Sequence, residues 1–139
     1  MSGRLDWHGS EASEMIHHRA IDFVTSAAII VERRVKQLLS IAGTASSIVK
    51  GHKGDRITNA VRSKPGEPPR KQTGDLRSKY TYEVDDESMT ARVGSNQPKA
   101  KALELGTRRG LLPRPALRRA LAETQAEIES LEGKIGENA

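Results

Sequence analysis

The chain has 139 residues, the length of one ordinary domain, of which 35% are hydrophobic and only 3% aromatic. This composition supports a thin core, so the chain either completes that core against neighbouring copies or remains a loose, partly disordered monomer. The chain has no cysteine, which excludes disulfides and thiolate metal sites, and no apolar run approaches the roughly 20 residues of a membrane span. Because residues 1–10 lack the pattern of a signal peptide, we expect a soluble protein made inside the cell.

The net charge of +5 is distributed unevenly along the chain. Residues 50–79 carry a charge of +6 and residues 107–121 carry +5, while residues 80–106 and 122–139 are acidic. Basic zones of this kind attract nucleic acid, but they also serve as solvated loops or pair with an acidic neighbouring subunit. The sequence leaves these three interpretations open.

Apolar residues three or four apart predict a long first helix. Ser10 or Ser13 is the expected cap at its start, and Gly43 the expected stop. Polar residues at 32–34, 36 and 37 should form an ordinary solvated face. The predicted apolar stripe consists of Ile16, Ala20, Phe23, Val24, Ala27, Val31, Val35, Leu38 and Ala42, widened by Ile29 and Ile30.

Glycines and prolines interrupt every regular pattern from residue 44 to residue 72. We expect one short turn near Ile57, Ala60 and Val61, and an extended polyproline II arm at Pro68-Pro69. An arm of this kind suits contact with a neighbouring molecule, although a mobile surface loop fits the same composition.

A β-hairpin should follow this region. Thr73-Gly74 predicts a turn, residues 76–84 alternate as one strand, residues 85–88 form a polar turn, and residues 89–93 return as the second strand. Residues 94–96 should close the hairpin. Since a lone hairpin is marginal in water, it is expected to pack on the long helix or to join further strands.

Two elements complete the chain. Pro98 and Gly106 are placed to start and end a short helix or turn. A last helix follows the rigid segment 112–115, with fraying expected over residues 133–139. Its predicted apolar stripe consists of Leu117, Leu121, Thr124, Ile128, Leu131 and Ile135, with Glu123, Glu127 and Glu129 facing outward. The order predicts a single α+β domain over residues 1–139, with a long N-terminal helix and a C-terminal helix packed on a small antiparallel sheet.

Catalytic and cofactor-binding patterns are missing from the sequence. The adjacent His17 and His18 point to different sides of a helix and make a poor metal pair. Residues 51–54 are too short for a phosphate-binding loop, and the acidic turn at 85–87 has the composition of a solvated turn or of a hard-cation site. We therefore expect neither an enzyme nor a cofactor. Glu104 stands in an apolar patch, so it should either pair with Arg108, Arg109 or Arg114, of the same subunit or the next, or point to water.

Four short motifs occur in a fixed order, at residues 63–69, 72–77, 102–107 and 113–121, and none is catalytic by itself. Their characteristic residues are Pro65, Gly66, Pro68, Pro69, Thr73, Gly74, Leu76, Arg77, Leu103, Glu104, Gly106, Thr107, Pro113, Arg114, Pro115, Leu117, Ala120 and Leu121. Together the motifs resemble the tail-completion family of long-tailed phages, related to tail terminators. Three aromatic positions of the family pattern are Lys99, Leu105 and Ala116 here.

The resemblance implies a virion protein at the head–tail junction, made in the host cytoplasm. It implies a homo-oligomeric ring, expected to be hexameric, between head-closure or adaptor proteins and the tail tube protein, with a channel for passing double-stranded DNA. Subunit and partner contacts are expected at Pro65, Pro68, Pro69, Thr73, Leu76, Arg77, Leu103, Glu104, Leu105, Arg114 and Leu117. The channel or an acidic ring is expected to meet Lys50, Lys53, Arg56, Arg62, Lys64, Arg70 and Lys71.

Two alternatives compete with this interpretation. The basic segment 50–79 fits a module that binds nucleic acid without sequence specificity, and such binding would weaken with salt. The two long helices fit a coiled-coil-like interaction protein that contains no sheet.

Overall fold

A computed structural model describes residues 3, 8–41, 47–49, 56–58, 63–71 and 74–137. The helices are α1 (Gly9–Leu38), α2 (Asp75–Ser78), α3 (Pro98–Leu105) and α4 (Leu117–Glu137), and the strands are β1 (Ser47–Val49), β2 (Arg56–Thr58), β3 (Tyr80–Asp85) and β4 (Thr90–Ser95). The predicted α+β class is confirmed. Because β3 and β4 pair as an antiparallel hairpin, a purely helical coiled coil does not describe this chain.

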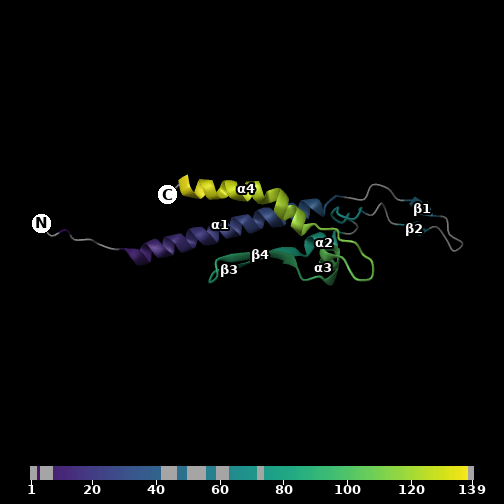
Figure 1. Cartoon of the computed structure of the whole chain (residues 1–139), viewed down its shortest axis with the longest axis horizontal. Coiled ribbons are helices and arrows are strands. Elements are labelled where there is room, and N and C mark those ends of the chain that lie inside the picture. The colour runs from purple at the N-terminus through teal and green to yellow at the C-terminus, as the bar shows by residue number, and fades with distance from the viewer. Residues whose placement is uncertain are drawn as a thin grey trace.

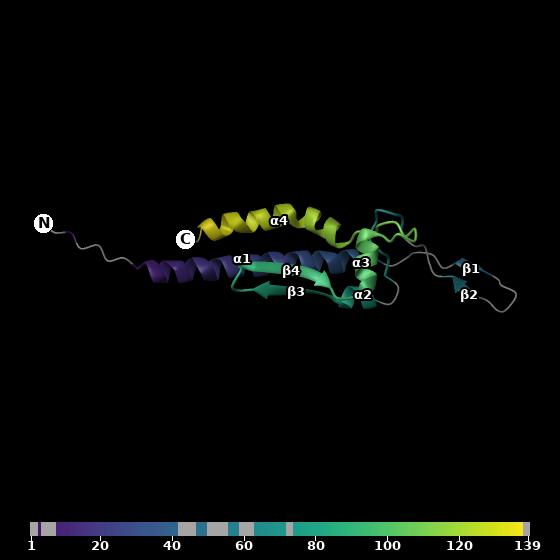
Figure 2. The ribbon, with the colours of Figure 1, turned by 60° about the horizontal axis from the view of Figure 1, so that its bottom comes forward.

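The long helix α1 is the centre of the fold (Figure 1). Helix α4 runs back along it, while the β3–β4 hairpin lies against another side of α1, with α2 and α3 at the base of the hairpin (Figure 2). The core forms where these layers meet. Its buried members are Val31, Val35, Leu38, Leu39, Tyr80, Ala100, Ala116 and Ala120.

The predicted stripe of α1 is confirmed toward its C-terminal end but not at its start. Val31, Val35 and Leu38 are buried, whereas Ile16 is 68% exposed because the first turns of α1 extend past both α4 and the hairpin. The expected serine caps are wrong: the helix already begins at Gly9, and its capping position, His8, makes no side-chain capping hydrogen bond. The helix ends at Leu38, before Gly43, and both Gly43 and Ala42 lie outside the described residues.

The predicted stripe of α4 is confirmed at Thr124 and at the partly buried Leu117 and Ile128, but it wrongly included Leu121 and missed the buried alanines at 116 and 120. Ala120 is fully buried and Thr124 is buried, while Leu121 is 55% exposed. The small alanine side chains allow close approach to α1. Helix α4 continues to Glu137, so the glycines at 133 and 136 do not end it; fraying of residues 133–139 stays a prediction.

The two faces expected to be simply solvated are joined to each other. Arg33 on α1 pairs with Glu127 on α4 at 2.8 Å, and Arg34 pairs with Glu123 at 2.6 Å. These pairs are partly exposed, so each contributes modestly, but together they hold α4 in register along α1.

The predicted hairpin is present, but its first strand is shorter than predicted and its second strand is longer. Tyr80 pairs with Ser95, and Asp85 pairs with Thr90. The expectation that the first strand begins at Leu76 is wrong, because Asp75–Ser78 forms one helical turn after Gly74, whose φ of 82° starts it. Thr73 lies outside the described residues. The second strand continues through Gly94 and Ser95, which were expected to close the hairpin.

Two short strands lie among the described residues between 44 and 72, where the sequence predicted none. Strands β1 and β2 pair as a second antiparallel hairpin, with Ile48 opposite Ile57, so the helical turn expected near Ile57 is wrong there; Ala60 and Val61 lie outside the described residues. Both views place these strands beyond the C-terminal end of α1 (Figures 1 and 2). Helix α3 forms as one of the two predicted alternatives, with Pro98 in its first turn.

Candidate interaction site at the α3–α4 junction

The first sequence motif folds as a tight turn at Pro65-Gly66. The Glu67 N–H donates to the Lys64 carbonyl at 3.0 Å, and Gly66 has a φ of 88°, the positive value that the third position of a type II turn requires. The segment is therefore not a continuous polyproline arm at this point.

This turn is docked on its own chain. The Gly66 N–H donates to the Pro113 carbonyl at 2.9 Å, Pro68 is buried, and Ser63 is only 3% exposed. Pro65 remains exposed. The expectation that Pro68 meets a partner is thus not supported within one chain, because the chain covers this residue itself.

Glu104 holds the start of α4. Its two carboxylate oxygens accept hydrogen bonds from the backbone N–H groups of Ala116, Leu117 and Arg118 at 2.9, 3.1 and 2.8 Å. These are groups that lack partners within the helix, and a carboxylate there also meets the positive end of the helix dipole. Within this chain, Glu104 is paired with backbone amides and not with Arg108, Arg109 or Arg114, and it does not simply point to water. An arginine partner from a neighbouring copy stays a prediction.

The segment between α3 and α4 is fixed by close backbone contacts. The Arg114 N–H donates to the Leu103 carbonyl at 2.6 Å. Gly106 has a φ of 77°, and a Cβ there would lie 2.7 Å from the Leu111 carbonyl oxygen and 3.1 Å from Pro113. Only glycine fits this position without displacing the chain.

Arg114 links this junction to the first motif. Its Nη1 donates to the Ser63 hydroxyl at 3.3 Å, while its buried Nε finds no hydrogen-bond partner among the described residues. The Tyr80 ring is packed in the same region, where burial, and to a smaller extent the nearby Glu104 carboxylate, raise the pKa of Tyr80 to about 12. Three of the four motifs thus meet at one junction.

The remaining motif, residues 72–77, contributes α2 at the base of the hairpin. Leu76 on α2 is half-buried against the core, as is Leu117 on α4. Arg77 is exposed, and Asp75 accepts a hydrogen bond from Gln97, the residue before α3, at 3.1 Å. Most of the expected contact residues therefore stabilise the chain's own fold.

Among those expected contact residues, Pro65, Arg77 and Leu105 present mostly accessible side chains. Leu105 is 57% exposed, and Leu111 and Leu112, which the sequence analysis missed, are 37% and 58% exposed beside it. Their signal in the sequence is two leucines that follow the loop between Gly106 and Gly110.

An apolar groove of about 330 Å³ runs between α4 and β4, with α1 as its floor. Exposed Leu121 forms part of its rim. Its lining consists of Val24, Ala27, Ala28, Val31, Ala91, Val93, Leu117, Leu121 and Ile128.

The basic residues expected near DNA or an acidic ring are not gathered by the described parts of the chain. Lys64 and Lys71 are exposed, Arg70 pairs with Glu67 at 3.7 Å, and Arg56 belongs to β2. The remaining three, Lys50, Lys53 and Arg62, lie outside the described residues.

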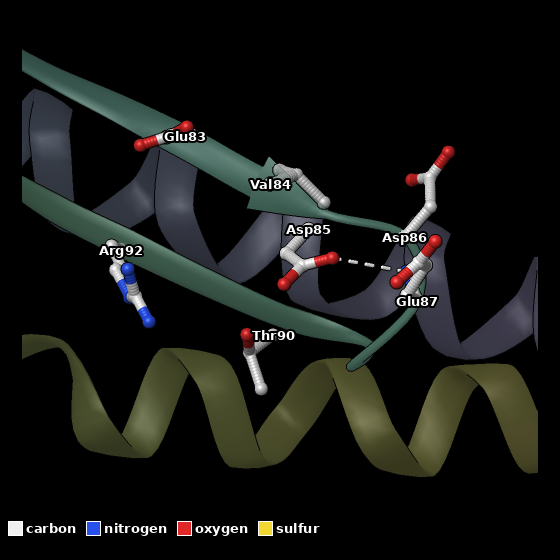
Figure 3. A pocket seen from close by; sticks show the side chains of 7 residues that line it. All are labelled: Glu83, Val84, Asp85, Asp86, Glu87, Thr90 and Arg92. Atoms are coloured by element: carbon white, nitrogen blue, oxygen red, sulfur yellow. Dashed lines mark hydrogen bonds between the residues drawn. The ribbon is translucent and has the colours of Figure 1, made fainter.

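The acidic turn after β3 borders a hollow of about 410 Å³ (Figure 3). The Asp85 carboxylate accepts hydrogen bonds from the N–H groups of Glu87 and Ser88 at 3.0 and 3.4 Å. Hydrogen bonding from the Ser88 side chain, and then from the Ser88 and Glu87 N–H groups, lowers the pKa of Asp85. Asp86 points away from the strands. Throughout the described residues, no group of three or more His, Asp or Glu side chains is arranged to hold a metal ion.

The helices that the structure describes include none long and apolar enough to cross a membrane. No protein-family model, curated protein or solved structure matches this chain.

Proposed function

We propose that this chain is a structural subunit of a phage head–tail junction, where copies close into a ring that completes the tail and joins it to head-closure proteins. By its sequence resemblance the ring contains six copies and leaves a channel for DNA. The observation that supports the proposal is the ordered set of four motifs, three of which meet at the α3–α4 junction and fix the course of the chain there.

The small number of fully buried large side chains agrees with association between subunits. Val35 is the only large side chain fully buried among the described residues, whereas Ile16, Leu105, Leu112 and Leu121 are each more than half exposed. Where such exposed apolar side chains are contiguous, a partner usually covers them.

Deletion of the gene in the genome that encodes the chain tests the proposal. The expected result is DNA-filled heads and finished tails that do not join, with infectivity restored when the intact gene is supplied from a plasmid. Normal infectious particles without the protein would refute the proposal. Binding of isolated duplex DNA by the purified protein, weakening steeply with salt, would instead favour the nucleic-acid-binding alternative.

A further inference from the structure

The loop formed by residues 105–112 is closed by its own hydrogen bonds. The Thr107 N–H donates to the Leu111 carbonyl at 2.9 Å, and the Leu111 N–H donates back to the Thr107 hydroxyl at 3.3 Å. The Gly110 N–H closes the turn on the Thr107 carbonyl at 3.2 Å. A surface ordered in advance loses little conformational entropy when a partner binds.

This loop exposes a combination of apolar and basic side chains. Leu105 and Leu112 are more than half exposed on its two flanks, and Arg108 and Arg109 are exposed at its tip. Neither arginine has an acidic partner within the part of the chain that the structure describes. Leucines beside unpaired arginines are typical of a docking surface for a partner that is both apolar and acidic.

The hairpin tip, residues 85–89, carries the complementary groups. Asp86 and Glu87 are exposed carboxylates without a basic partner among the described residues, and Met89 is 42% exposed. Met89 has a φ of 51°, the single positive value at a described residue other than glycine. Such a conformation costs energy, and here it accompanies an apolar side chain held in solvent beside the acidic groups.

The two surfaces lie at opposite ends of the β3–β4 hairpin. The 105–112 loop follows α3 at the hairpin base, and the tip lies six strand residues away (Figures 1 and 2). One copy therefore cannot bring its own loop onto its own tip.

We propose that the 105–112 loop of one copy docks on the hairpin tip of a second copy, a contact that rests on the ring put forward as the protein's function. Arg108 and Arg109 then face Asp86 and Glu87, and the loop leucines cover Met89. Because the two surfaces differ, the contact is heterologous, and repetition of it gives a closed ring or an open filament.

Cysteine cross-linking tests this contact without interference, because the chain has no cysteine of its own. The full-length protein carrying Arg109→Cys and Glu87→Cys is oxidised and separated on a denaturing gel. We expect a ladder of linked chains, with peptide mass spectrometry joining position 109 of one copy to position 87 of another. The matched control pairs Arg109→Cys with Glu132→Cys, an exposed site on α4, and should give at most one-tenth of the linked product.

Charge reversal supplies a second measurement at exposed positions that should not affect folding. Arg108→Glu with Arg109→Glu, or Asp86→Lys with Glu87→Lys, should each weaken self-association about tenfold or more, and all four changes together should restore it to within about threefold. Circular dichroism of each variant confirms that it is folded.

The possible failures are distinguishable. One result would overturn the proposed contact and leave the proposed function intact. In that result the wild-type protein forms rings, the cysteine pair cross-links no more than the control pair, and neither charge reversal weakens self-association. A wild-type protein that stays monomeric at every concentration would overturn the contact together with the ring on which it rests. Arginine reversals that abolish DNA binding but leave self-association unchanged would assign the loop to DNA and overturn the contact.

Discussion

Replacing Glu104 with alanine should strongly weaken the attachment of α4 to the rest of the fold. The change removes an acceptor for three backbone N–H groups at 2.8–3.1 Å. Loss of a helix cap costs about 1 kcal/mol, and loss of a carboxylate at a helix N-terminus costs about 0.3–1 kcal/mol. Partly buried N–H groups left without partners add about 1–2 kcal/mol. The free energy of unfolding should therefore fall by about 2–4 kcal/mol.

The more conservative change Glu104→Gln should cost about half as much, because the amide oxygen still accepts hydrogen bonds but the charge is gone. Urea unfolding followed by circular dichroism measures both variants at one fixed protein concentration, since association also shifts apparent stability. Glu132→Ala and Glu132→Gln are the matched controls, because Glu132 is exposed on the same helix, and each should stay within about 0.5 kcal/mol of wild type.

Hydrogen exchange locates the effect. In the Glu104→Ala variant, the amides of residues 116–118 should lose protection, because their acceptor has been removed, while those at the middle of α1 should not. A Glu104→Ala protein within 0.5 kcal/mol of wild type, with unchanged exchange at these amides, would refute the capping role.

Three further predictions concern a turn, a buried phenol and an ion pair. Gly106→Ala should destabilise the fold more than Gly66→Ala, because both have positive φ but only a methyl group at 106 meets a backbone oxygen at 2.7 Å; equal losses in urea unfolding would contradict this. In a Tyr82→Phe background Tyr80 should ionise near pH 12, and stability should fall as pH rises above about 10, because only the unfolded phenol has lost its proton there; tyrosinate absorbance and unfolding curves check this, and ionisation near pH 10 would contradict it. Glu123→Gln should cost less than about 1 kcal/mol, because this carboxylate bridges two partly exposed arginines and hydrogen bonds from them hold its pKa low; the stability difference from wild type should vanish in acid, and a difference that persists there would argue against the ion pairs.

Long elements were predictable from sequence because their signal is local. Apolar spacing along α1 and alternation in β3 report which face each element buries, and Pro98 and Gly106 mark the ends of α3. The same alternation misled at Leu76, where a strand-like pattern continued into a helical turn that Gly74 starts.

Contacts between distant segments were not predictable. Glu104 finds its partners 12–14 residues away among backbone amides, which carry no sequence signature. Ala120 occupies the buried centre of α4 because α1 approaches closely there, whereas hydrophobicity alone favoured Leu121. The ring, its partners and the DNA channel stay predictions.

Native mass spectrometry of the purified full-length chain, combined with electron microscopy of the same sample, tests the central claim most directly. The ring model predicts one closed species built from six 15.2 kDa subunits, with rotational symmetry and an open centre. A well-folded single subunit of 15.2 kDa at every concentration would contradict it.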